Sequence, residues 1–280
     1  IFQLALDILK KSKACQLLIP LAGWSVVSTI IQIIKMCLGV AAHKFSIIWM
    51  FQNLYAGFQG GPWFLWAMWW GVVVVLVGRY IFKDNPIVYA LVCLATFFIP
   101  DGMWPATYKF MLPFFILAYA FNAHDWKTKL KKFYMHPVCI IACVGIFAYL
   151  LSLYDYDTYI YTSGYYIFQY ENNHFWQLHS NVLRFFVGLF GSISISYLIY
   201  GLVSVLPEKI NKVIAYVGST TLGVYILSNY IFDEMHRLSI PGFSYLYLII
   251  ETVVIMAVCV LLTVGMQKSK ILNRILLGGR

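Results

Sequence analysis

This chain of 280 residues contains few charged residues, and their small number excludes a water-soluble globular domain. Only 11% of the residues are charged, whereas 61% are hydrophobic and 18% are aromatic. Soluble domains carry about one quarter charged residues. The long apolar segments therefore predict an all-α, polytopic helical membrane protein, because only helices and closed barrels satisfy their backbone in lipid and no alternating strand pattern is present.

The chain also lacks the residue patterns of several catalytic and metal sites. None of its six cysteines lies in a C-x-x-C pair. Cys139 and Cys143 are one helical turn apart, but they would need His136 or another ligand to hold a metal, so small buried apolar residues are the favoured interpretation. No Ser-His-Asp arrangement, zinc cluster or P-loop appears. We therefore expect no disulfide framework and no metal.

Eight hydrophobic segments approach the ~20 residues that a helix needs to cross the hydrocarbon core. They cover residues 16–38, 62–79, 86–100, 107–122, 135–153, 182–205, 213–232 and 243–266. No repeat or linker divides them, so we expect a single transmembrane domain over residues 1–280. Residues 267–280 alternate basic and apolar side chains, which predicts a short amphipathic helix that lies on anionic lipid as an anchor.

Basic residues gather in alternate loops between these segments. Fifteen of the 20 Lys and Arg residues fall in one set of loops, which includes both ends of the chain. Because positive charge concentrates on the cytoplasmic side of membrane proteins, both ends are predicted to be cytoplasmic. The same rule accounts for the net charge of +9 without a nucleic acid partner.

A tryptophan-rich stretch predicts a helix that begins at a wet surface. Residues 60–71 read GGPWFLWAMWWG, with four tryptophans in eight positions behind two glycines and a proline. Proline suits the first turn of a helix, and tryptophan favours the boundary between water and hydrocarbon. An interfacial belt explains any single tryptophan, but four together favour the wall of a binding site, with Trp63 and Trp66 lining it.

The predicted outer loop at residues 154–179 combines many aromatic rings with carboxylates and amides. Flat apolar rings can stack on sugars, and Asp, Asn and Glu can bond to their hydroxyl groups. An amphipathic segment that lies among lipid headgroups would have the same composition. For the loop as a whole, the two interpretations are equally favoured.

Four motifs in the order of the chain resemble the acyltransferase-3 family of bacterial integral membrane O-acyltransferases. They are KKSKACQLLIP at residues 10–20, GPWFLW at 61–66, MLPFFILAY at 111–119 and GSTTLGVYIL at 218–227. Together they cover nearly the whole chain. Family members have about ten spans, so the resemblance implies that this chain begins at the third span and that the proposed catalytic His lies on the first span, before Ile1.

The resemblance implies transfer of an acetyl or similar small acyl group from acyl-CoA to a hydroxyl of a cell-surface glycan or lipid-linked sugar. It also implies a bacterial cytoplasmic membrane and polysaccharide-synthesis proteins as partners. Lys10, Lys13 and Gln16 would form the donor-side loop. The family has R-x-x-R where this chain has Lys13 and Gln16, and neither replaces a bidentate guanidinium.

A set of basic residues could bind the phosphates of such a donor, although the positive-inside rule already accounts for these basic residues. These residues are Lys10, Lys11, Lys13, Lys127, Lys129, Lys131 and Lys132. On the acceptor side we assign substrate binding to Trp63, Trp66, Tyr225 and His179. A histidine such as His179 is more often a surface residue than a functional one.

Two ionisable residues are assigned as catalytic groups. Glu251 lies well inside an apolar segment, where an ionised carboxylate is costly unless it is paired or faces a polar cavity. Function is favoured over a structural hydrogen bond, and the carboxyl group would orient a catalytic His or an acceptor hydroxyl. Arg184 either pairs with Glu251 or holds an anionic group, or it snorkels to the outer interface.

A non-enzymatic alternative is an exporter of polysaccharide or lipid, or an inactive accessory membrane subunit. The departures at Lys13 and Gln16 favour it, and transporters also carry charged residues inside the membrane. The sequence shows no inverted repeat and no pair of broken helices, which transporters commonly have.

Overall fold

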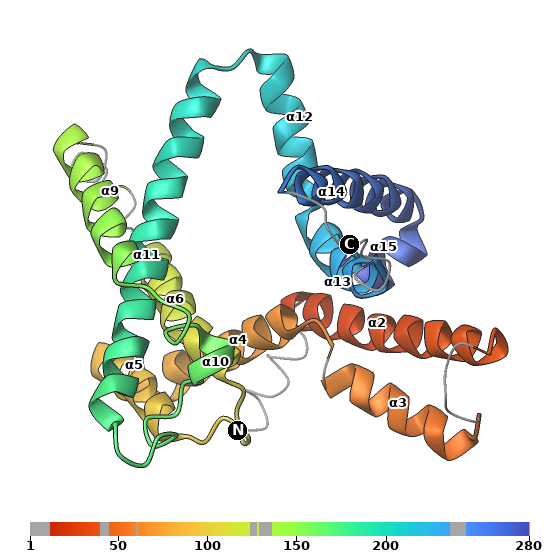
Figure 1. Ribbon diagram of the computed structural model, residues 1–280, viewed down its shortest axis with the longest axis horizontal. Coiled ribbons are helices and arrows are strands. Elements are labelled where there is room, and N and C mark those ends of the chain that lie inside the picture. Colours follow the sequence, from red (N-terminus) through yellow and green to blue (C-terminus); the bar gives the residue numbers. More distant parts are fainter. Residues whose placement is uncertain are drawn as a thin grey trace. The chain divides into compact units, whose positions relative to one another are not determined.

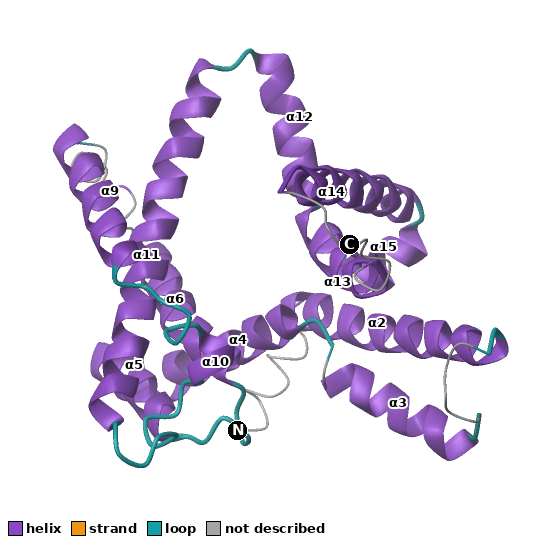
Figure 2. Cartoon of the chain, in the orientation of Figure 1, coloured by secondary structure: helices purple, strands orange, loops and turns teal. Residues whose placement is uncertain are grey.

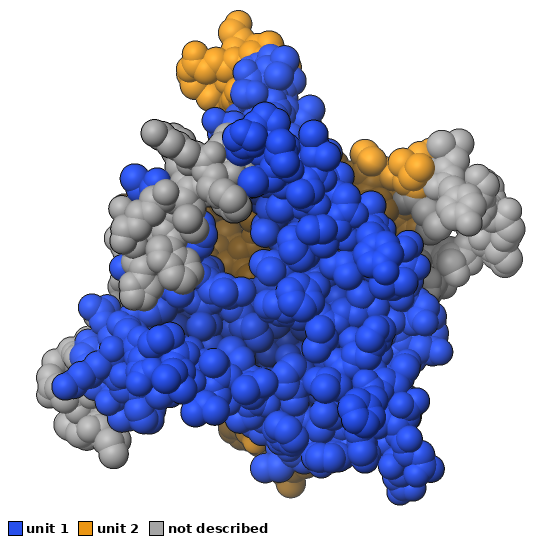
Figure 3. Space-filling model, turned by 90° about the vertical axis from the view of Figure 1, so that its left-hand side faces the viewer, with its two compact units in different colours: residues 1–8, 66–206 blue, residues 9–65, 207–280 orange. Residues whose placement is uncertain are grey.

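The computed structural model describes residues 12–39, 45–59, 61–123, 128, 136–235 and 245–279, and for residues 12–15, 230, 232–235 and 245–248 it describes the backbone alone. This part of the chain contains twelve α-helices, one 3-10 helix and no strand (Figure 2). The predicted all-helical class is therefore confirmed. The chain divides into unit 1, residues 1–8 and 66–206, and unit 2, residues 9–65 and 207–280 (Figure 3).

Unit 1 holds most of α4 (Trp63–Phe82) and six further helical elements. They are α5 (Pro86–Ala95), η1 (Thr96–Phe98), α6 (Ala106–Ala123), α9 (Pro137–Ser152), α10 (Ile160–Ser163) and α11 (His174–Val205). Side-chain caps begin the helices where the sequence provides them: Asn85 Oδ1 accepts from the N–H of Ile87, and Asn173 Oδ1 accepts from the N–H of Trp176. Within this unit α9 packs along α11 (Figure 1).

Unit 2 is built around α2 (Ser12–Cys37), whose neighbours are α3 (Ile47–Gln59) and α15 (Lys270–Leu277). The unit also contains α12 (Glu208–Ser219), α13 (Thr221–Met235) and α14 (Tyr245–Lys268). The α2–α3 contact is partly polar, because Asn53 Nδ2 donates to Thr29 Oγ1 over 3.1 Å and the Ser25 hydroxyl donates to the carbonyl of Leu54.

Helix α3 was not among the predicted elements. Ile47, Phe51 and Tyr55 recur every four residues and remain exposed, whereas Gly57 lies against Ser25 of α2. This spacing is the signal of an amphipathic helix. With 13 residues the helix is shorter than the ~20 residues of a membrane-crossing segment, which explains why no span is predicted there.

The predicted C-terminal amphipathic helix is present as α15, and it also packs against α2. The indole N–H of Trp24 donates to the carbonyl of Leu276 over 2.8 Å, and Leu276 is buried. Gly23 permits this approach, because a Cβ atom there would lie 2.5 Å from the carbonyl oxygen of Ile275. The tail is therefore packed against α2, with only part of its apolar face left for lipid.

The predicted span at 213–232 is a bent pair of helices. Helices α12 and α13 meet at an angle of 51° near Thr220. The hydroxyls of Ser219, Thr220 and Thr221 donate back to the carbonyls of Tyr216, Val217 and Gly218. Such bonds compete with the helical backbone and bend helices, which explains why the GSTT sequence breaks the span.

Among the described residues, four helices are long and apolar enough to cross a membrane, or five if the bent pair counts as one span. They correspond to the predicted segments 16–38, 62–79, 182–205 and 243–266, with 213–232 as the bent pair. The segments at 86–100 and 135–153 form shorter apolar helices, because α5 ends after ten residues and α9 after 16. The chain is a multi-pass membrane protein, and the full set of eight spans stays a prediction.

Candidate functional site

A polar face at the start of α11 organises the candidate site in unit 1. Gln177, Ser180, Asn181 and Arg184 follow the i, i+3, i+4, i+7 spacing of one helix face, and all four are buried. This spacing was visible in the sequence. It was missed because the predicted span began at residue 182 and separated Arg184 from the other three.

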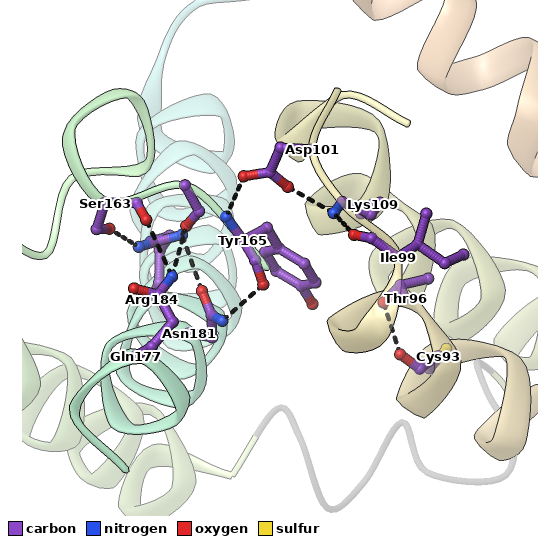
Figure 4. A network of polar contacts seen from close by, with 11 residues as sticks. Cys93, Thr96, Ile99, Asp101, Lys109, Ser163, Tyr165, Gln177, Asn181 and Arg184 are labelled. Atoms are coloured by element: carbon purple, nitrogen blue, oxygen red, sulfur yellow. Dashed lines mark hydrogen bonds and ion pairs between the residues drawn. The ribbon is translucent and has the colours of Figure 1, made fainter. Parts of the chain in front are cut away.

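Arg184 donates four hydrogen bonds, three of them to the preceding loop and one to Asn181 of its own helix, and Figure 4 shows those to Ser163 and Asn181. Its Nε donates to the carbonyl of Thr158 over 2.9 Å, and its Nη1 donates to the carbonyl of Gly164 over 2.8 Å and to Asn181 Oδ1 over 3.1 Å. Its Nη2 donates to Ser163 Oγ over 2.5 Å. With 4% of its surface exposed, Arg184 does not snorkel.

Amide side chains from the same face complete the attachment of this loop. Gln177 Nε2 donates to the carbonyls of Ser163 and Gly164, both over 3.1 Å, and Asn181 Nδ2 donates to the carbonyl of Tyr165 over 3.0 Å. Gly164 has a φ of 70°, and a Cβ atom there would overlap Gln169 and Asp101. Only glycine fits this close crossing of segments.

An ion pair between a buried lysine and a half-buried aspartate joins this loop to α6 and to the segment before it. Lys109 Nζ lies 2.5 Å from Asp101 Oδ1 and donates to the carbonyl of Ile99, while Asp101 Oδ2 accepts from the N–H of Tyr165 over 2.9 Å. Lys109 has no exposed surface. A buried ammonium is tolerated because it is both paired and hydrogen-bonded. The arrangement in Figure 4 thus ties residues 99–109 to residues 158–165.

Tyr165 lies between the buried polar face of α11 and the ion pair of Lys109 with Asp101. Its ring stacks on Phe97 at a centroid distance of 5.0 Å, and Lys109 Nζ lies 5.6 Å from its centroid. Burial raises the pKa of Tyr165 to about 12. Its phenol is therefore neutral throughout the physiological range, and the residue acts as a rigid spacer.

An apolar groove adjoins the same segment. It has a volume of about 410 Å³ and is lined by α4, by α5 and by Ile99, Met103 and Trp104. Ile99 therefore contributes its side chain to the groove and its carbonyl to Lys109. The buried Nε1 of Trp104 has no hydrogen-bond partner among the described residues. The ion pair thus fixes one end of the groove wall.

In unit 2 the structure brings together two of the residues assigned to substrate binding. The ring of Phe64 contacts Trp63 edge to face at 6.2 Å and Tyr225 at 6.0 Å. Trp63 and Tyr225 are half-buried, and so is Trp66, which belongs to unit 1. Within unit 2, Phe64 therefore links Trp63 of α4 with Tyr225 of α13.

The other assigned residues have different surroundings. Glu251 is half-buried on α14 and makes no hydrogen bond or ion pair with any described residue, whereas the described donations of Arg184 all stay within unit 1. His179 is exposed on α11, away from the buried face formed by its neighbours. None of these positions tests a catalytic role.

The predicted donor-side residues are only partly visible. Lys10 lies outside the described residues, as do Lys11, Lys127, Lys129, Lys131 and Lys132. Lys13 lies in the first turn of α2, and its side chain is not described. Gln16 is half-buried, and its carbonyl lies beside Gly278 after α15. Within the described ranges, no group of three His, Cys, Asp or Glu side chains could hold a metal ion.

The helices and their apolar surfaces define a class, the multi-pass helical membrane proteins. Comparison with protein families then identifies the family. The model described as "Acyltransferase domain" matches residues 10–264, which run through both units, so the chain belongs to the acyltransferase-3 family. In the same comparisons no curated protein and no solved structure matches the chain.

Proposed function

We propose that the protein is a membrane O-acyltransferase that moves an acetyl or similar small acyl group from acyl-CoA to a hydroxyl of a cell-surface glycan or lipid-linked sugar. The family match over residues 10–264 carries this proposal. The protein acts in the bacterial cytoplasmic membrane with both ends of this segment cytoplasmic, because its basic loops alternate accordingly. Proteins of polysaccharide synthesis are its partners.

The reaction replaces the C–S bond of the thioester donor with the C–O bond of an ester. The hydroxyl oxygen of the acceptor attacks the thioester carbonyl, a C–O bond forms and the C–S bond breaks. The proton of the hydroxyl passes to a base, and CoA leaves as the thiol. A carboxyl group such as Glu251 supports this step by orienting the base or the hydroxyl.

Exposed rings support a glycan as the acceptor. Tyr156, Tyr161 and Phe175 are well exposed, and Asp155 and Asp157 lie in the same segment. Hydrogen bonds from the hydroxyl and the N–H of Thr158 lower the pKa of Asp155, so this carboxylate remains ionised and able to accept from sugar hydroxyls. The clustering of Trp63 and Tyr225 supports a second aromatic wall.

The test is the acyl content of surface glycans in cells that carry the full-length protein or its variants. We expect Glu251→Gln to abolish glycan acylation without lowering protein abundance, as measured by NMR of the purified glycan and by immunoblotting. Glu208→Gln is the matched control, because Glu208 is an exposed surface residue paired with Lys212. Wild-type acylation in the Glu251 variant would remove this residue from the mechanism.

A second measurement separates an enzyme from an exporter. The purified protein, supplied with acetyl-CoA and a glycan acceptor, should release free CoA thiol. If deletion of the protein lowers the amount of surface glycan while its acyl content per sugar stays constant, the acyltransferase proposal is wrong.

A further inference from the structure

The groove between α4 and α5 is lined almost entirely by apolar side chains. Along α4 it runs from Trp70 to Phe82, twelve residue steps or about 18 Å at ~1.5 Å per residue. This length is comparable to one leaflet of a hydrocarbon core that is ~30 Å thick. Its other lining residues on the two helices are Val73, Val74, Val77, Gly78, Val88, Tyr89 and Val92.

Close packing at Gly78 sets the floor of the groove. A Cβ atom on Gly78 would lie 2.5 Å from atoms of the Tyr89 ring, so only glycine lets the ring lie against α4. The Tyr89 hydroxyl donates to Asp84 Oδ1 over 2.8 Å. The floor is therefore held in place by packing and by a hydrogen bond.

A rigid basic turn stands at the Phe82 end of the groove. Lys83 and Asp84 have positive φ angles of 52° and 59°, and the N–H of Asp84 donates to the carbonyl of Gly78 over 3.1 Å. The Asp84 carboxylate also accepts from the hydroxyl of Tyr119. These bonds fix the backbone from which Lys83 projects.

The turn and the end of α4 therefore contain two exposed cations, Arg79 and Lys83, and one carboxylate, Asp84, that is already hydrogen-bonded. Lys83 and Arg79 are both exposed, and Arg79 directly follows Gly78, which lines the groove. Both oxygens of Asp84 accept hydrogen bonds from tyrosine hydroxyls. Arg79 and the turn therefore carry a net positive charge at the end of the apolar groove, whose length is comparable to one membrane leaflet.

We propose that this groove binds one acyl chain of an anionic phospholipid, with the phosphate of its headgroup held by Arg79 and Lys83. The apolar lining suits a hydrocarbon chain and offers no partners for the amide groups of a CoA arm. The basic turn selects an anionic headgroup, since Lys and Arg near a membrane surface attract acidic lipids. The site does not depend on the transfer reaction.

The test is native mass spectrometry of the full-length protein in detergent micelles with added phosphatidylglycerol or phosphatidylcholine. We expect one retained phosphatidylglycerol and a clear preference over phosphatidylcholine. Arg79→Gln and Lys83→Gln should each weaken phosphatidylglycerol binding about fivefold and weaken phosphatidylcholine binding less, because the choline cation already neutralises the phosphate of that lipid. Lys209→Gln, which removes an exposed Lys on α12, is the matched control and should have no effect.

Filling the groove tests the chain-binding half of the proposal. Val92→Trp should abolish retention of both lipids, and Val73→Phe is a second, smaller filling variant in case the first does not fold. Val144→Trp, on an exposed position of α9 outside the groove, is the control. The proposal is overturned if folded filling variants retain phosphatidylglycerol as the wild type does, or if Lys209→Gln weakens it as much as Lys83→Gln.

Discussion

Arg184 and Glu251 carry the same sequence signal, a single charge in an apolar helix, but their surroundings differ. Arg184 is almost fully enclosed and donates four hydrogen bonds, three of them to the loop before α11. Glu251 is half-buried and bonds to no described residue. Arg184 thus holds the backbone of the loop in place, whereas no described residue gives Glu251 a comparable contact.

The comparison shows that an apolar flanking sequence does not reveal the role of a charge. A buried cation is stable where carbonyl oxygens replace its hydration, and it then becomes a structural centre. A charged side chain in an apolar helix that is not used in this way is a candidate for a functional role. Substitutions at the two sites should therefore separate stability from activity.

The largest effect should follow loss of Arg184. Arg184→Met removes four buried hydrogen bonds, and of their acceptors the Gly164 carbonyl keeps a second donor, Gln177 Nε2. Because each buried acceptor left without a donor costs ~1–3 kcal/mol, we expect a loss of about 3–5 kcal/mol in the free energy of unfolding. Thermal unfolding of the purified protein measures it. Arg184→Lys should not restore stability, because a single ammonium cannot donate in all these directions. Full stability of the Lys variant would show that charge alone matters.

Loss of the Lys109 charge should be the next largest effect. Lys109→Met leaves the Asp101 carboxylate without its ion pair, at a cost of about 3 kcal/mol. The double variant Lys109→Met with Asp101→Asn should regain part of this loss, because no unpaired charge remains. A double-mutant cycle of melting temperatures checks it, and strictly additive losses would contradict the coupling.

Substitution of Gly78 in the groove floor tests a steric contact, in contrast to the loss of charge at Arg184 and Lys109. Gly78→Ala places a methyl group against the Tyr89 ring, so we expect a loss of about 1–3 kcal/mol, seen as a lower melting temperature. Gly145→Ala is the matched control, since a Cβ atom on Gly145 meets no atom within 4 Å. Helix propensity alone favours Ala at both positions, so a gain in stability at Gly78 equal to the gain at Gly145 would contradict the packing argument.

The neutral Tyr165 phenol predicts a pH dependence in the alkaline range. Because burial raises its pKa to about 12, above the ordinary value of 10.0, its contribution to stability is complete below pH 10 and is lost as the pH rises toward 12. Tyr165→Phe keeps the stack on Phe97 and should weaken this decline. Melting temperatures measured across this range check it, and parallel pH curves for both proteins would contradict it.

The smallest effect on stability should come from Glu251 itself. Glu251→Gln is nearly isosteric and breaks no described contact, so we expect a change within about 0.5 kcal/mol. Together with the expected loss of glycan acylation, this result would complete the contrast with Arg184. A large loss of stability would instead place Glu251 in a structural role.

Much of the helical architecture could be predicted from apolar length alone. The helix starts at Asn85 and Asn173 follow from their capping side chains, and the bend near Thr220 has a visible cause in its run of hydroxyl residues. Helix α3 shows a four-residue period that could have been detected. The short α5 could not be recognised by composition, because its apolar sequence continues through η1 without a polar stop.

By itself the sequence determined an all-helical membrane protein and its family motifs, because apolar length and residue order are local properties of the chain. Only the tertiary structure decided that Arg184 and Lys109 are buried and satisfied. Their partners Thr158, Gly164 and Asp101 lie in other segments, and nothing in the spacing along the chain specifies which carbonyl oxygen meets which cation. The close approaches at Gly78 and Gly164 were also decided by the tertiary structure. A glycine is required at these positions only because of the atoms that pack where its Cβ atom would lie.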